Sequence, residues 1–357
     1  MGKAVCKMLI ERVKTVDGVA TSESSLRCTE IHGEAVEIRW PAQRFGRVMK
    51  TRMWSALLSA LLEVAALACG PVHAQQRPVE RATGTLAKVQ RAGAITIGYR
   101  DASLPFSFLN ARMEPVGYSV ELCRELVTAI EDAVNKSLVI RWAPVTSGSR
   151  VDAVEGGEVD LECGSTSVTP ERQKRVSFSP IIFVSGTKLL VRKASSIKSS
   201  RDLAGRRVAV IAGTTNEKAL RALSDQVKPG IKLLAARDRI ESFELLKSGQ
   251  VDAFASDDVL LHGLIAQEAA KAEYAVTRDY LSFESYGIMY RKQDTQLRNL
   301  IDETFRVLAE DGEIERQYRR WFLRALPTGE SLNLPMSARL EAIIQTMATK
   351  GRAGRRP

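Results

Sequence analysis

Residues Glu162–Phe183 read ECGSTSVTPERQKRVSFSPIIF, and this stretch indicates how the chain is built and what it binds. Ser165, Thr166 and Ser167 follow a short apolar run that is typical of a β-strand. Arg172 comes one helical turn into the segment after them. Hydroxyl and backbone N–H donors beside a guanidinium suit a carboxylate, because the planar fork of arginine matches two carboxylate oxygens. The stretch therefore predicts a carboxylate-binding site at the end of a strand.

Short β-rich runs alternate with helical stretches on both sides of this site. We expect strands at 94–99, 138–142 and 159–163, and a second series at 207–211, 231–235 and 251–255. Helices are expected at 119–134, behind a Ser119 N-cap, and at 217–227 and 239–248. This alternation is typical of α/β folds with a parallel sheet and helices on both faces. Two such series predict two lobes.

Two extended runs, 181–192 and 285–291, lie where one series gives way to the other. Two crossings mean that the chain leaves lobe 1 and later returns to it, so that lobe 1 is discontinuous. A helical region at 295–322, broken near Asp311 and Gly312, follows the return. We expect lobe 1 at 82–185 plus 286–340, lobe 2 at 186–285, and a basic C-terminal tail at 341–357.

Residues 49–74 are typical of a secretory signal peptide. A basic start, an apolar middle and small residues precede an expected cleavage after Ala74. Cys69 offers a lipid anchor as the alternative, although Ala66 stands where a larger aliphatic residue is usual. Residues 1–48 precede the signal, so we expect them to be untranslated or unstructured.

The formal net charge of +10 does not indicate nucleic acid, because much of it lies in the leader region and in the C-terminal sequence KGRAGRRP. A frayed basic tail explains those last residues better than a binding arm does. Beyond the leader only Cys123 and Cys163 remain of five cysteines. An oxidising compartment permits a disulfide between them, but we expect two separately buried thiols.

Polar residues suited to ligand binding recur at the expected strand ends, where α/β sheets hold their ligands. Each has an ordinary alternative, since Gly-Thr-Thr before a helix is often a cap and arginine is mostly a surface residue. Their equivalent positions in the topology favour one shared site. The candidates are Arg100, Ser147, Arg150, Ser165, Ser167, Arg172, Thr215 and Asp257.

These residue types predict a zwitterionic ligand with an extra negative charge. Arg172 suits an α-carboxylate, and Thr215 adds a donor from the other lobe. Asp257 suits an α-ammonium group. Arg100 and Arg150 then remain for a second, distal carboxylate.

Catalytic readings have little support. His262 is the only histidine beyond the leader, and it falls in an apolar helix. No metal-ligand spacing, Ser–His–Asp set or phosphate-binding glycine pattern occurs, so we expect no enzyme, cofactor or metal. Glu162 is more simply a structural counter-ion than a base, and Phe106 is a pocket wall or a core residue.

From about Thr85 to Leu334 the chain resembles the periplasmic amino-acid-binding proteins of ABC importers, and most of all their glutamate/aspartate-binding branch. The resemblance rests on the ECGSTS…ERQ…FS block, with LPFSF, VGYSVEL, FSPIIFVSGTKLLV and the C-terminal NLP segment. It implies an α/β, two-lobed periplasmic binding protein fold of type II, with a two-strand hinge on which the lobes close around the ligand.

The resemblance also implies roles for single residues. Arg172 and Ser165 match the residues for the α-carboxylate, Thr215 the contact of the closing lobe, and Asp257 the ammonium partner. Arg100 stands where relatives that bind cationic amino acids or glutamine carry an acid, so it fits an acidic side chain, supported by Ser147 and Arg150. Ser167 replaces a usual threonine. Arg239 stands where the branch commonly has histidine, which leaves the choice among aspartate, glutamate and longer diacids open.

We therefore expect a monomeric periplasmic protein that captures L-glutamate or L-aspartate and delivers it to an inner-membrane ABC permease. The enzyme alternative is a periplasmic cyclohexadienyl or arogenate dehydratase on the same fold, which needs a proton donor facing the ring. A sensor domain is a third reading.

Overall fold

The computed structural model describes residues 5–16, 19–29, 35–39, 82–326 and 329–353; up to residue 39 and beyond 349 it describes the backbone alone. The chain forms two compact units, Met1–Val79 and Glu80–Pro357. The predicted signal peptide, 49–74, lies outside the described residues. In the first unit β1 (Val5–Val16), β2 (Val19–Thr29) and β3 (Ala35–Arg39) pair as an antiparallel sheet, where we expected an untranslated or unstructured segment. That residues 1–48 are not translated stays a prediction.

Lobe 1 of the second unit is built on a five-stranded sheet of order β10-β18-β9-β4-β8. Its helices pack on this sheet around a core that includes Ile97, Leu122, Leu126, Ile130 and Phe305. The strands are β4 (Ala94–Tyr99), β8 (Val139–Pro144), β9 (Leu161–Glu162), β10 (Val176–Phe178) and β18 (Met289–Arg291). The helices are α2 (Gly84–Ala92), α3 (Tyr118–Val134), α4 (Arg150–Gly156), α5 (Pro170–Gln173), α9 (Thr295–Glu310), α10 (Glu313–Tyr318), the π-helical turn η2 (Arg319–Leu323) and α11 (Ala338–Ala353).

Lobe 2 is built on a second five-stranded sheet, of order β14-β13-β15-β12-β16. Apolar side chains form one cluster with α7 and α8 and another with α6, so helices cover both faces of the sheet. The strands are β12 (Thr187–Arg192), β13 (Arg207–Ile211), β14 (Lys232–Ala236), β15 (Ala253–Asp257) and β16 (Tyr274–Val276). The helices are η1 (Ser200–Leu203), α6 (Thr215–Gln226), α7 (Arg239–Lys247) and α8 (Asp258–Gln267).

A two-stranded antiparallel sheet joins the lobes. β11 (Phe183–Ser185) pairs with β17 (Glu284–Tyr286) where the chain crosses to lobe 2 and comes back. Lobe 1 contains β18 from after the return, so it is discontinuous as predicted. A third sheet, of β5 (Ala102–Ser103), β6 (Ser107–Leu109) and β7 (Pro115–Val116), belongs to lobe 1.

Two local predictions are wrong. The sheets are mixed and not wholly parallel, because β18 and β12, which adjoin the crossings, run antiparallel to β9 and β15. Ser119 does not cap α3, since the N-cap is Gly117 at φ 134°. A Cβ at Gly117 would lie 2.3 Å from the Phe106 carbonyl oxygen, so this close turn requires glycine.

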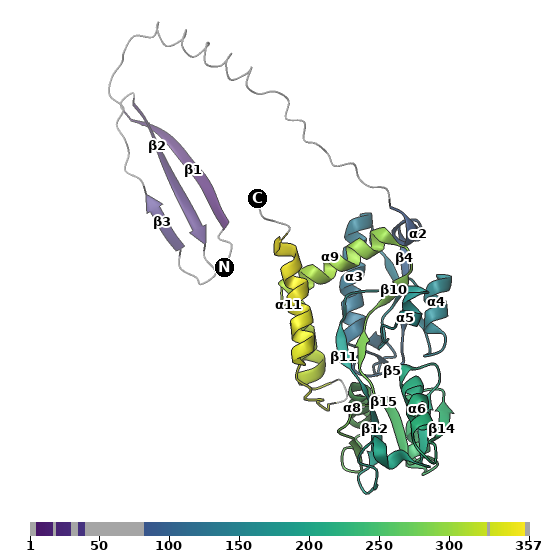
Figure 1. Cartoon of the computed structure of the whole chain (residues 1–357). Helices are drawn as coiled ribbons and strands as arrows, with labels where there is room; N and C mark the ends of the chain where they lie inside the picture. The colour runs from purple at the N-terminus through teal and green to yellow at the C-terminus, as the bar shows by residue number, and fades with distance from the viewer. Residues whose placement is uncertain (1–4, 17–18, 30–34, 40–81, 327–328, 354–357) are drawn as a thin grey trace. The chain divides into compact units, whose positions relative to one another are not determined.

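The C-terminal residues differ from the expected tail. Helix α11 packs against α9, and Figure 1 shows the two side by side. Leu340 and Ile344 join the lobe 1 core at helical spacing, with Met347 packed against it. This apolar stripe anchors residues that sequence analysis assigned to a basic extension. In the part of the chain that the structure describes, no helix is long and apolar enough to cross a membrane.

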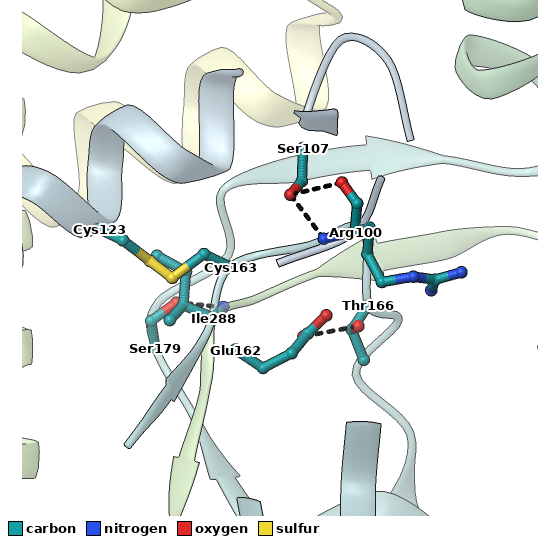
Figure 2. Close-up of a disulfide and its surroundings, with 8 residues drawn as sticks. All are labelled: Arg100, Ser107, Cys123, Glu162, Cys163, Thr166, Ser179 and Ile288. Carbon is teal, nitrogen blue, oxygen red and sulfur yellow. Dashed lines mark hydrogen bonds between the residues drawn. A yellow bond between two sulfur atoms is a disulfide. The ribbon is translucent and has the colours of Figure 1, made fainter. Parts of the chain in front are cut away.

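Cys123 and Cys163 form a disulfide, so the prediction of two separate thiols is wrong. Their Cα atoms lie 6.3 Å apart, within bridging range. The bond ties α3 to the residue that follows β9, and Figure 2 shows it beside Glu162. Sequence spacing could not reveal this pairing, because α3 and β9 are brought together only by the fold.

We predict that replacing both cysteines by alanine lowers the free energy of unfolding by about 3–4 kcal/mol, since the closed loop constrains the unfolded chain. Its ends are 40 residues apart in sequence. Urea unfolding of the oxidised protein, the reduced protein and the double variant measures the effect. The reduced protein and the variant should unfold alike. Identical urea midpoints for the oxidised and reduced protein would show that no disulfide stabilises the fold.

Candidate ligand site between the lobes

The predicted residues lie at carboxyl ends of strands and at the first turns of the helices that follow. Three segments of lobe 1 and three of lobe 2 supply them. Arg100 follows β4, Ser147 and Arg150 follow β8, Ser165, Ser167 and Arg172 follow β9, Thr215 begins α6, Arg239 begins α7, and Asp257 ends β15.

Arg100 is almost fully buried, at 4% exposure, just after β4. Its backbone N–H donates to Ser107 Oγ at 2.9 Å, and its Nη2 donates to Ser147 Oγ at 3.1 Å. Its Nε and Nη1 have no hydrogen-bond partner among the described residues. Figure 2 shows the guanidinium extending away from the disulfide. A buried cation with unpartnered donors calls for an acceptor, preferably an anion.

Two further buried guanidiniums belong to the same cluster. Arg150 and Arg239 each keep a buried Nε without a partner among the described residues. Burial lowers the pKa of both, and burial together with Arg150 and Arg239 lowers the pKa of Arg100 to about 9. These shifts mark like charges held together away from water. Arg239 Nη1 also donates across the lobes to Ser103 Oγ at 2.9 Å and to the Ala102 carbonyl at 3.3 Å.

Arg172 lies in the short helix α5, which Thr169 caps. Its Nη1 donates to the Ser167 carbonyl at 2.8 Å. This bond folds the side chain back over residues 165–167, which we call the hydroxyl loop. Burial and Arg150 lower its pKa to about 10. In the same loop Ser165 is buried and its Oγ has no partner among the described residues. Guanidinium and hydroxyl thus stand together as the opening stretch of sequence predicts.

Lobe 2 meets this loop through Thr215. Thr214 caps α6 by accepting from the Glu217 N–H, so the cap explanation holds for Thr214 and not for its neighbour. Ser167 Oγ and Thr215 Oγ1 lie 3.3 Å apart, and Arg172 Nη2 donates to the Gly213 carbonyl at 3.4 Å. These contacts join the two lobes at the hydroxyl loop.

Asp257 is buried at the N-terminus of α8 but makes no side-chain cap. Its carboxylate accepts from Asn216 Nδ2 at 2.8 Å and from the Tyr286 hydroxyl. Burial raises its pKa, and these two hydrogen bonds oppose the rise. The carboxylate is therefore fixed in place, and a nearby cation would stabilise its ionised form.

Sequence reasoning missed three residues that shape this site. Asn216 and Tyr286 orient Asp257, and Glu284 lies beside the hydroxyls of Ser167 and Thr215. Burial and Asp257 raise the pKa of Glu284. Tyr286 and Glu284 belong to β17, within or next to the extended run expected at 285–291. A run of this kind signals a crossing, but it does not show which side chains point toward the site.

Other candidates lie in the core. Phe106 is fully buried and packs edge-on against Tyr118, Phe183, Tyr286 and Phe322, so it is a core residue. No group of His, Cys, Asp and Glu side chains in the described part of the chain could hold a metal ion. The arrangement can hold two anionic groups and one cationic group by charge-assisted hydrogen bonds.

Comparison with known proteins gives this site a context. An L-glutamate/L-aspartate-binding protein of Pseudomonas aeruginosa is 40% identical over 302 residues, covering 84% of this chain and 98% of that protein. A glutamate/aspartate import solute-binding protein of Salmonella typhimurium is 35% identical over 290 residues, or 81% of this chain and 96% of that one. These relatives are named as binding proteins and not as enzymes.

Solved structures share the fold. A mutant of ArgBP from T. maritima superposes with a TM-score of 0.59 at 27% identity, covering 68% of this chain and 100% of that chain. An ancestral amino acid-binding protein, described as a precursor of cyclohexadienyl dehydratase, gives 0.58 at 28% identity and covers 67% and 99%.

The matched family is the bacterial extracellular solute-binding proteins, family 3, over residues 95–324. This match spans both sheets and the hinge, which confirms the two-lobed binding-protein fold inferred from the sequence. The chain belongs to the family 3 bacterial extracellular solute-binding proteins.

Proposed function

We propose that this protein captures L-glutamate or L-aspartate between its two lobes and delivers it to an ABC permease. The observation that carries the proposal is the cluster of Arg100, Arg150 and Arg239, buried with unpartnered donors, next to the single guanidinium–hydroxyl group around Arg172. A ligand with two carboxylates supplies acceptors to both parts. The names of the relatives from Pseudomonas aeruginosa and Salmonella typhimurium support this ligand class.

The α-carboxylate fits the hydroxyl loop. Arg172 offers its guanidinium there, and Ser165 offers a buried hydroxyl without a partner among the described residues. Ser167 and Thr215 form a hydroxyl pair across the lobes, so an anion beside this pair can receive a donor from each lobe. A carboxylate bound in this way holds both lobes at once.

The α-ammonium fits Asp257. Burial raises the pKa of Asp257, because it disfavours the charged carboxylate. A cation beside the carboxylate offsets this cost. Asn216 and Tyr286 keep the two oxygens oriented, so little conformational entropy is lost on binding.

The distal carboxylate fits Arg100, supported by Ser147 and Arg150. Ser147 already accepts from Arg100 Nη2, which leaves Nε and Nη1 for the ligand. Arg239 adds a fourth positive charge from lobe 2 and contacts β5 of lobe 1. Its longer reach than the histidine usual in the glutamate/aspartate branch favours contact with a side-chain carboxylate.

Closure of the lobes completes the site. Thr215, Arg239 and Asp257 come from lobe 2 and the remaining ligand residues from lobe 1, so a ligand gains all its contacts only in the closed state. Charge-assisted hydrogen bonds contribute about 1.5–3 kcal/mol each. A handful of them gives micromolar affinity, about −8 kcal/mol, after the cost of association.

Three further points belong to the proposal. The protein works in the periplasm after export by the predicted signal peptide, it acts as a monomer, and permease subunits recognise its closed form. No observation favours the dehydratase alternative: His262 lies in α8, buried enough that its pKa is lowered, and it has no contact with the arginine cluster among the hydrogen bonds and ion pairs of the described residues.

Replacing Arg172 by alanine should abolish binding of every amino acid, because all of them carry an α-carboxylate. Replacing Arg100 by alanine should weaken acidic amino acids selectively, by about 1.5–3 kcal/mol or roughly tenfold to 150-fold. Titration calorimetry with L-glutamate, L-aspartate and L-glutamine measures both. Arg175→Ala is the control, since Arg175 pairs with Asp152 and Glu155 on the surface. Undiminished binding in both variants would refute these roles.

The secreted protein should begin at Gln75. Intact-mass measurement of protein recovered from the periplasm gives the cleavage site directly. A mass that includes residues 1–48 would contradict the proposed start, and an added lipid on Cys69 would contradict simple cleavage.

A further inference from the structure

Glu162 is a buried carboxylate to which the proposed function gives no role. It ends β9, one residue before the disulfide, and its exposure is 0%. A fully buried acid is costly unless it is paired or has a cation nearby. Its surroundings therefore indicate what it does.

The carboxylate is fixed but only half satisfied. Oε2 accepts from Thr166 Oγ1 at 2.8 Å, as Figure 2 shows, whereas Oε1 has no hydrogen-bond partner among the described residues. A Cβ at position 164 would lie 2.3 Å from Oε1 and 2.9 Å from Arg100 Cγ. Glycine at this position thus lets the carboxylate and the Arg100 side chain approach the same point of the loop.

The backbone around Glu162 is held on several sides. β9 lies between β4 and β18 in the sheet, and Cys163 is bonded to Cys123 on α3. Thr166 links the side chain to the hydroxyl loop. The carboxylate of Glu162 is therefore held in a fixed position, and its side chain does not rotate out of the site when a ligand binds.

This charge acts on three guanidiniums. The electrostatic effect of Glu162 raises the pKa of Arg100, Arg150 and Arg172, against the lowering caused by burial. Arg100 and Arg150 belong to the proposed distal subsite, and Arg172 to the α-carboxylate subsite. A single acid thus offsets part of the positive charge of both.

The charges of the cluster then define the ligand that neutralises it. Four arginines face three carboxylates, namely Glu162, Asp257 and Glu284, which leaves a formal charge of +1 in the ionised state. Two other acids are left out of this sum. Asp258 accepts from Ser185 and Tyr280. Asp101 also raises the pKa of Arg100, but it is exposed, so solvent screens its charge. A dicarboxylic amino acid carries −1 at neutral pH, whereas a dicarboxylate without an ammonium group carries −2.

We propose that Glu162 is a specificity-determining residue that favours dicarboxylic amino acids over dicarboxylates lacking an ammonium group. By fixing one negative charge inside the arginine cluster, it leaves one net charge for the ligand to neutralise. The proposal rests on the proposed function. It concerns the relative affinity for two classes of diacid, and it assigns no direct contact between Glu162 and the ligand.

The test compares L-glutamate with glutarate, and L-aspartate with succinate, by titration calorimetry at neutral pH. The wild-type protein should favour the amino acid of each pair. Glu162→Gln raises the formal charge to +2 and should shift each ratio toward the dicarboxylate by about tenfold or more, since one unit of charge changes close to the ligand. Glu155→Gln removes a carboxylate that pairs with Arg175 on the surface, and should leave the ratios unchanged.

Thr166→Val separates charge from geometry, since it removes the hydroxyl bonded to Oε2 but keeps the acid. Its ratios should stay as in the wild type. If Glu162→Gln does not fold, Glu284→Gln removes another carboxylate of the same cluster, also raises the formal charge to +2, and should shift the ratios in the same direction.

Unchanged ratios in Glu162→Gln would overturn the inference, and so would unchanged ratios in Glu284→Gln if Glu162→Gln does not fold. Failure of the wild type to bind either amino acid would instead contradict the proposed function, so the two failures are distinguishable.

Discussion

Burial of like charges is the constraint on which the site depends. Arg100, Arg150 and Arg239 are removed from water at one place, and none of them makes an ion pair among the described residues. Such an arrangement is unfavourable by itself, because desolvation and mutual repulsion both oppose the charged forms. Buried carboxylates offset part of this positive charge, and an anionic ligand can neutralise the rest. A ligand that neutralises these charges removes the unfavourable free energy of burying them, and this gain adds to its binding free energy.

The fold supplies the rigidity that this arrangement needs. Two mixed sheets place the carboxyl ends of their strands toward the same region, and the hinge strands β11 and β17 contribute to it directly. The Tyr286 hydroxyl holds Asp257 from the hinge, while aromatic packing around Phe106 and Phe183 supports the same strand pair. Hinge and ligand site are thus physically coupled, so that a ligand that orders one constrains the other.

Local patterns in the sequence predicted much of this. Ala94–Tyr99 and Arg207–Ile211 have the predicted bounds, and the break near Gly312 lies between α9 and α10. The nine candidate site residues lie at the expected strand ends and helix starts. Features that depend on tertiary contact were not predictable: the Cys123–Cys163 pairing, the packing of α11 on α9, and the roles of Asn216 and Tyr286. No spacing encodes them, because their partners lie far away in the chain.

The most direct test of the central claim is a crystal structure of the protein with L-glutamate. The account predicts one ligand between the lobes, with its α-carboxylate on Arg172, its ammonium on Asp257 and its side-chain carboxylate on Arg100. A ligand bound elsewhere would contradict the account. So would a ligand between the lobes whose carboxylates contact none of the arginines.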